Sequence, residues 1–140
     1  MIFSSEAELL QFGEKIGKNL IKEGFTKTPL VIELIGDVGV GKTTLTRGIA
    51  KGLGVKEAIT SPSFTISKRY AFGDKNLAHY DFYRLPDAGI MSEELAESIS
   101  DPNVIVIIEW GASVSDILPK DHIIYRISIN DDGSRTVEQE

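Results

Sequence analysis

The chain has 140 residues, of which 41% are hydrophobic and 26% are charged, and its formal net charge is -6 at pH 7. This length predicts one compact domain, residues 1–140, and the acidic balance excludes an overall basic field that would hold nucleic acid. Cysteine is absent and histidine occurs twice, which excludes disulfides, thiolate nucleophiles and the usual zinc frameworks.

Residues 4–22 predict an amphipathic helix that packs on a sheet. Ser4 or Ser5 is suited to cap its N-terminus, and Gly24 is suited to end it. Apolar residues recur between its charges at near-helical spacing, namely Leu9, Leu10, Phe12, Ile16, Leu20 and Ile21. Acids occur from Glu6 onward without a long apolar stretch, so we expect no signal peptide, no membrane span and a cytoplasmic location.

Residues 30–53 combine a strand, a phosphate-binding loop and a helix. The apolar run 30–35 leads into Gly36-Asp37-Val38-Gly39-Val40-Gly41-Lys42-Thr43, a complete G-x-x-x-x-G-K-[ST] sequence, and residues 44–53 follow with helical periodicity. In such a loop, backbone N–H groups and the helix dipole bind phosphate, Lys42 reaches the β- and γ-phosphates, and the Thr43 hydroxyl holds Mg²⁺. The alternative is a glycine-rich turn that binds nothing, and the flanking strand and helix argue against it.

The next segment concentrates hydroxyl side chains around one proline. Its sequence is Ser61-Pro62-Ser63-Phe64-Thr65, one connection downstream of the phosphate loop. That position is suited to a switch-like loop that senses the γ-phosphate. An ordinary capped turn has the same composition, so the residues alone leave both interpretations open.

Two β-prone runs, residues 64–72 and 77–83, predict a β-hairpin with a four-residue turn at 73–76. Alternation in the second strand places His79 and Asp81 on one face. His79 is expected to be a hydrogen-bonded structural histidine rather than a catalyst.

Asp81 is an acid within an otherwise apolar, aromatic strand. Burying an unpaired carboxylate costs several kcal/mol, so Asp81 needs a partner. Mg²⁺ with its waters fits this requirement, and so does a structural ion pair with Arg69 or Arg84. The residues alone do not choose between them.

The run 104–110 predicts a strand buried on both faces, and it ends in Glu109 and Trp110. In phosphate-loop folds, an acid at the end of such a strand lies beside the Mg²⁺ site, usually as Asp. The longer arm of Glu109 permits metal coordination, orientation of the attacking water, or both. The alternative is a strand-terminal glutamate that only meets solvent. Before this strand, Ser92 is expected to cap a short helix that carries no chemistry.

The C-terminal part predicts a helical turn at 113–118, a strand at 123–129 and a last hairpin ending near 137. Alternation late in the strand predicts an outer position in the sheet. No internal repeat or low-complexity linker occurs, so no domain boundary is expected.

Four motifs in series resemble the TsaE family, the small ATPases of bacterial threonylcarbamoyladenosine tRNA modification, formerly grouped as YjeE-like. They are GDVGVGKTT (36–44), SPSFTI (61–66), HYDFYRL (79–85) and IEW (108–110). The resemblance implies a P-loop NTPase-like, three-layer α/β fold with a mainly parallel central sheet and added antiparallel strands. It implies binding of ATP and Mg²⁺, weak hydrolysis, and association with the TsaB–TsaD heterodimer, through which tRNA is reached only indirectly.

The resemblance also assigns roles to residues. Lys42, Asp81 and Glu109 match the catalytic positions, with Thr43 and Glu109 on the metal. The nucleotide-binding positions are Gly36, Asp37, Val38, Gly39, Val40, Gly41, Lys42, Thr43, Thr44 and Trp110, and the nucleotide-responsive loop is Ser61, Pro62, Ser63, Phe64 and Thr65. Three positions depart from the family: Ser63 replaces a usual threonine, Ala112 a common glutamate and Leu9 a common threonine.

The functional hypothesis is therefore a weak Mg-ATPase that supports turnover of the TsaB–TsaD complex. No residue is an evident arginine finger, so the isolated chain is expected to hydrolyse ATP slowly. A small-molecule kinase would need an arginine-rich lid, and a GTPase would need an N-K-x-D segment; the sequence has neither. A non-catalytic nucleotide sensor is disfavoured only by Asp81 and Glu109.

Overall fold

The computed structural model describes residues 1–24, 30–60, 62, 66–83 and 89–140. A seven-stranded sheet in the order β1-β7-β6-β2-β5-β4-β3 forms the middle layer. The strands are β1 (Ile2–Phe3), β2 (Leu30–Ile35), β3 (Ser67–Phe72), β4 (Lys75–Asp81), β5 (Val104–Glu109), β6 (Ile123–Ile129) and β7 (Arg135–Gln139). The helices are α1 (Glu6–Glu23), α2 (Lys42–Leu53), α3 (Ile90–Ser100) and the 3-10 helix η1 (Gly111–Ile117).

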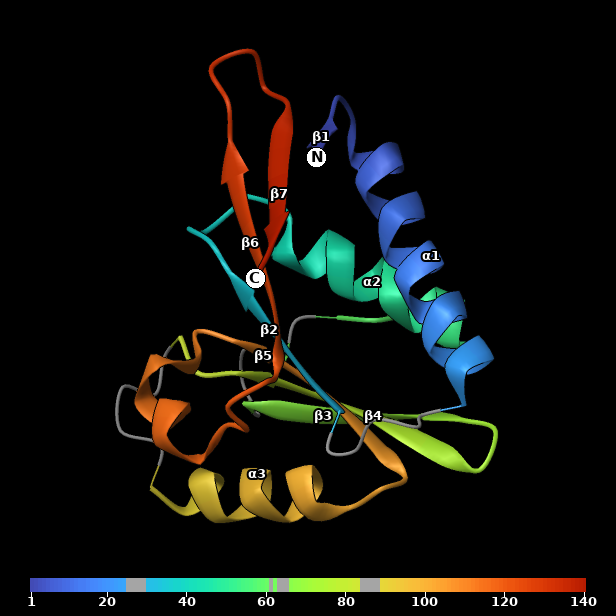
Figure 1. The fold of residues 1–140 in the computed structure, drawn as a ribbon, viewed down its shortest axis with the longest axis vertical. Coiled ribbons are helices and arrows are strands. Elements are labelled where there is room, and N and C mark those ends of the chain that lie inside the picture. Colours follow the sequence, from blue (N-terminus) through green and yellow to red (C-terminus); the bar gives the residue numbers. More distant parts are fainter. Residues whose placement is uncertain (25–29, 61, 63–65, 84–88) are drawn as a thin grey trace.

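The sheet is parallel in its centre and antiparallel at its borders. β4, β5, β2 and β6 run parallel to one another, whereas β3, β7 and β1 are added antiparallel. Helices α1 and α2 cover one face of the sheet, and α3 covers the other (Figure 1). Each face has its own apolar core, and β5 is buried along its whole length between them. The predicted three-layer α/β fold is confirmed.

Helix α1 follows the prediction at both ends. The Ser5 side chain accepts the Glu8 N–H at 3.2 Å, and Gly24 ends the helix with φ 70°. Its contact with α2 is unusually close because glycines face backbone. A Cβ on Gly17 would lie 2.3 Å from the Ile49 carbonyl oxygen, and a Cβ on Gly52 would lie 2.1 Å from that of Glu14. The two helices therefore form one rigid layer above the sheet.

Three local predictions need correction. The β3–β4 turn has two residues, Gly73 and Asp74, rather than four, since Phe72 already pairs with Lys75. Helix α3 begins at Ile90, and the Ser92 hydroxyl lies inside it, donating to the Gly89 carbonyl at 2.7 Å instead of capping.

The third correction concerns β6, which was expected at the border of the sheet. The sheet instead continues beyond it, through β7 and then β1. The predicted last hairpin, β6–β7, is confirmed. In the described part of the chain, no helix is long and apolar enough to span a bilayer.

Candidate nucleotide and metal site

The phosphate-binding loop connects β2 to α2 at the carboxyl ends of the parallel strands. Gly41 precedes the helix with φ 114°, a left-handed conformation that glycine adopts readily. The first turn of α2 has no side-chain cap and no acidic residue. Its N–H groups and the positive end of its dipole are therefore available to an anion.

Lys42 is the cation at the centre of the site. Its side chain is 6% exposed, and its ammonium donates to the Gly36 carbonyl and lies 4.0 Å from the centroid of the Trp110 ring. Burial lowers the pKa of Lys42, while the carboxylates of Glu109, Asp81 and Asp37 act to raise it. The ammonium is thus held on backbone and aromatic atoms, facing acidic side chains.

Asp81 and Glu109 end two neighbouring parallel strands and are paired in register. Glu109 is only 3% exposed, so the alternative of a glutamate that meets solvent is wrong. Asp81 is half-buried, and its Oδ1 accepts the Tyr83 N–H at 3.0 Å. In the part of the chain that the structure describes, Arg69 donates to the Ser98 hydroxyl and has no contact with Asp81, while Arg84 lies outside that part.

His79 is a structural partner of Glu109, as its fully buried position suggests. Its Nε2 lies 2.6 Å from Glu109 Oε2. Within the described residues, Nδ1 has no hydrogen-bond partner. A proton on Nδ1 would be buried without an acceptor, so the proton is placed on Nε2, which donates to the carboxylate. This bond fixes one oxygen of Glu109.

Trp110 follows Glu109 with φ 57° and ψ 48°, a strained conformation for a bulky residue. Its ring lies against Lys42 on one side and has its centroid 4.8 Å from that of Tyr83. The backbone turn therefore places the indole beside the phosphate loop. This is where the resemblance expects an aromatic residue next to a nucleotide.

Most of the switch-like loop lies outside the described residues: Ser61, Ser63, Phe64 and Thr65. Pro62 is described and buried, and its carbonyl accepts the Ile66 N–H at 2.9 Å. Ile66 has φ 66°, and its own carbonyl accepts the Asp81 N–H at 2.8 Å. The end of this loop is thus bonded directly to the backbone of Asp81.

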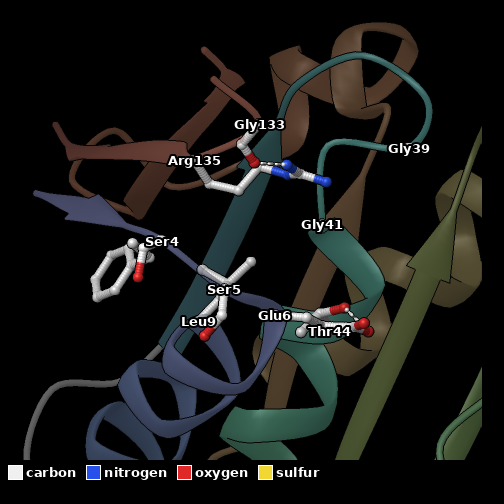
Figure 2. A pocket seen from close by; sticks show the side chains of 10 residues that line it. Ser4, Ser5, Glu6, Leu9, Gly39, Gly41, Thr44, Gly133 and Arg135 are labelled. Carbon is white, nitrogen blue, oxygen red and sulfur yellow. Dashed lines mark hydrogen bonds between the residues drawn. The ribbon is translucent and has the colours of Figure 1, made fainter. Parts of the chain in front are cut away.

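A polar cavity of about 350 Å³ opens on the other side of the phosphate loop (Figure 2). It lies between the loop, the start of α1 and the β6–β7 hairpin. Thr44 donates from Oγ1 to Glu6 Oε1 at 3.0 Å, and Arg135 donates from Nε to the Val40 carbonyl at 2.8 Å. The side chain of Leu9 packs against Gly41, since its Cδ2 lies 2.6 Å from where a Cβ on Gly41 would be. The Leu9 side chain therefore contacts the loop through apolar atoms.

Sequence reasoning proposed Lys42, Thr43, Asp81 and Glu109 for the site and did not consider Glu6 or Arg135. Those two residues reach the loop from the two ends of the chain, and neither belongs to a motif. The predicted loop residues differ in burial, and Gly36, Gly41 and Thr43 are intermediate. Asp37, Val38 and Gly39 are exposed, whereas Val40, Lys42 and Thr44 are buried. Ala112, a departure from the family pattern, is exposed on η1.

The sequence model described as threonylcarbamoyl adenosine biosynthesis protein TsaE matches residues 3–137. The tRNA threonylcarbamoyladenosine biosynthesis protein TsaE of Haemophilus influenzae is 35% identical over 133 residues, covering 95% of this chain and 83% of that protein. The TsaE protein of a Nostoc species is 40% identical over 111 residues, covering 77% of this chain and 68% of that protein. The crystal structure of Bacillus subtilis YdiB superposes with a TM-score of 0.77 at 29% identity, covering 98% of this chain and 80% of that one. This chain belongs to the TsaE family.

Proposed function

We propose that this protein binds Mg-ATP and hydrolyses it slowly, in the biosynthesis of threonylcarbamoyladenosine in tRNA. One observation carries the proposal. Lys42, Asp81 and Glu109 converge at the carboxyl edge of the parallel sheet, beside the uncapped N-terminus of α2. A cation, two carboxylates and a set of free backbone N–H groups are the components that phosphoryl transfer requires.

The triphosphate would lie along the loop. Its β- and γ-phosphates would be bound by the N–H groups of residues 36–44 and by the Lys42 ammonium, which would leave the Gly36 carbonyl. The nucleoside would occupy the polar cavity of Figure 2, because this cavity opens beside Gly41 and Thr44, at the start of α2. Trp110 would lie next to the phosphates on the opposite side.

The residues present fit a magnesium ion that is shared with the nucleotide. In the described residues, no group of three or more His, Asp or Glu side chains could hold a metal by itself. Mg²⁺ is usually bound by one or two carboxylates together with phosphates and waters, and the Thr43 hydroxyl with Glu109 supplies that partial set. Glu109 Oε2 is occupied by His79, and Oε1 has no hydrogen bond among the described residues. Bound Mg²⁺ would neutralise charge on the β- and γ-phosphates.

Asp81 and Glu109 would also orient the attacking water. Their paired positions at adjacent strand ends place both carboxylates on the side of the sheet that carries Lys42. A supplied arginine accelerates such reactions by about 10³–10⁵-fold. Here the described arginines already have partners: Arg47 with Ile59, Arg69 with Ser98, Arg126 with Glu140, and Arg135 with the Val40 carbonyl of the loop itself. Hydrolysis by the chain alone is therefore expected to be slow.

The proposed partner is the TsaB–TsaD heterodimer, supported by membership of the TsaE family. The net charge of -6 argues that tRNA is bound by the partners rather than by this chain. The work would take place in the cytoplasm, where tRNA is modified. ATP hydrolysis would then reset the complex between rounds of modification.

The test is phosphate release from Mg-ATP by the purified protein, alone and with cognate TsaB, TsaD and tRNA. Lys42→Ala and Glu109→Ala should each abolish release, and the partners should raise the wild-type rate. Glu138→Ala, a change of an exposed acid on β7, is the matched control and should leave the rate unchanged. Absence of hydrolysis with all partners folded and present would reduce the proposal to nucleotide-dependent binding.

A further inference from the structure

We infer that Arg135 is a positioning residue of the phosphate loop, holding the Gly41 N–H toward the nucleotide phosphates. This inference rests on the proposed nucleotide binding. Arg135 is half-buried on β7, and Figure 2 shows its guanidinium reaching from the hairpin to the loop between Gly39 and Gly41. Its Nε donates to the Val40 carbonyl at 2.8 Å, across 95 positions of sequence.

The bond to Val40 controls the neighbouring amide. The Val40 carbonyl and the Gly41 N–H belong to one planar trans peptide, so they point in opposite directions. When Arg135 holds the carbonyl on the hairpin side of the loop, the Gly41 N–H is directed away from the hairpin, toward the concave side that would hold phosphate.

Glycine at position 41 makes this restraint necessary. Its φ is 114°, and a residue without Cβ permits the preceding peptide to rotate at little cost. The side chain of Val40 is buried, but that fixes the side chain rather than the direction of its carbonyl. Arg135 supplies the missing constraint, and preorganised donors of this kind bind anions without reorganising first.

Arg135 is itself held before any nucleotide arrives. It is paired in the sheet with Phe3 on one side and Ile129 on the other. Its Nη1 donates to the Gly133 carbonyl at 2.6 Å. The turn below it is closed by Asp132, whose Oδ1 accepts both the N–H and the hydroxyl of Ser134, at 2.9 and 2.6 Å. The guanidinium therefore presents Nε in a fixed direction.

Two substitutions separate this role from simple attraction between charges. Gln carries its amide nitrogen at the same number of bonds from the backbone as Nε of arginine, so Arg135→Gln keeps a donor for Val40 and removes the charge. Arg135→Met has a side chain as long as that of Gln, ending where Nε lies in arginine, and removes both the donor and the charge. Arg126→Met is the matched control, because Arg126 lies in the same hairpin but pairs with Glu140 and is half exposed.

The experiment is calorimetric titration of each purified variant with Mg-ADP. Arg135→Met should bind about tenfold more weakly than wild type, Arg135→Gln within about threefold, and Arg126→Met equally well. Equal weakening in the Met and Gln variants would assign the effect to charge and overturn the inference, as would wild-type affinity in Arg135→Met. A wild-type protein that binds no nucleotide would instead reject the proposed function.

A second measurement does not depend on stability. In the wild-type protein and in Arg135→Gln, addition of Mg-ADP should produce a large change in the amide ¹H shift of Gly41. In folded Arg135→Met that change should be clearly smaller. An identical change in all three proteins would overturn the inference, even if their affinities differed.

Discussion

The two sides of the phosphate loop are built from different parts of the chain. On one side, Asp81 and Glu109 end adjacent parallel strands. On the other side, Glu6 and Arg135 come from the beginning of α1 and from β7, which pairs antiparallel with its neighbours. The first side carries the acids that, in the proposed function, would act on the transferred phosphate. The second contacts the loop itself and fixes its shape.

This difference predicts that the two sides fail in different ways. Changes among the acids should lower the turnover rate and leave nucleotide binding largely intact. Changes among the elements that hold the loop should weaken binding or folding. This difference would be contradicted if a change among the acids weakened nucleotide binding, or if a change among the elements that hold the loop lowered only the turnover rate.

The largest effect is expected for Glu109→Gln. The substitution keeps the volume of a residue that is 3% exposed but removes its charge, and loss of such a group typically lowers the rate about 10²–10⁴-fold. Single-turnover phosphate release measures the rate, and titration with Mg-ADP measures binding, which should change much less. Equal losses of rate and affinity would place Glu109 in ground-state binding instead.

The next effect concerns His79, which donates to Glu109 at 2.6 Å. His79→Leu removes the donor and should lower kcat about tenfold with little change in KM, because the carboxylate is no longer oriented. His79→Gln, which retains an N–H at similar reach, should recover most of the rate. If the Gln variant recovered folding but no activity, the hydrogen bond would be structural only.

On the other side of the loop, Gly17→Ala tests the layer formed by α1 and α2. The added Cβ would meet the Ile49 carbonyl oxygen and the Leu53 nitrogen, which are backbone atoms that cannot rotate away. Overpacking of this kind lowers the free energy of unfolding by about 1–3 kcal/mol, which urea unfolding measures. Asn19→Ala, at an exposed position in the same helix, is the control and should not lower the free energy of unfolding. Equal stability of Gly17→Ala and wild type would mean that the helices can separate.

The smallest effect is a pH dependence of binding that arises from Lys42. Burial lowers its pKa below the ordinary 10.5, so the unliganded protein loses this proton earlier than free lysine as the pH rises. Bound phosphate raises the pKa again. As the pH rises, the affinity for Mg-ADP should therefore begin to fall at a pH lower than 10.5. In that pH range, binding of Mg-ADP should be accompanied by uptake of protons. Titration in buffers of different ionisation enthalpy detects the uptake, and Lys42→Ala should abolish it.

The sequence singled out both acids that the structure brings together at the ends of β4 and β5. Glu109 was proposed from its place at the end of a buried strand. Asp81 was noted as an acid in an apolar strand, but only the family resemblance assigned it to the site. The structure places them side by side because β4 and β5 are parallel neighbours. Glu6 was missed because its contact depends on how α1 packs on α2, and Arg135 because its contact depends on which strands become neighbours. Alternation in β6 indicates which face is buried but not what lies beside it, so the addition of β7 and β1 was not foreseen.

One signal in the sequence was available but unused. Gly13 and Gly17 are four residues apart in α1, and so are Gly48 and Gly52 in α2. Such spacing places both glycines of a helix on one face and permits close approach. It predicts the contact between helices, although not that this contact brings Glu6 to Thr44.

The strained residues near the acids set a limit on engineering this protein for stability. Within the described residues, Ile66 and Trp110 are the non-glycine residues with positive φ, and each strained residue of this kind costs about 1–3 kcal/mol. Ile66 is bonded to Asp81, and Trp110 follows Glu109. A substitution such as Ile66→Gly would relieve this strain, at the cost of a side chain that packs against the core beside α3. Relief of either strain would also loosen the acid beside it, so any heat tolerance gained in this way would come at the expense of the proposed turnover.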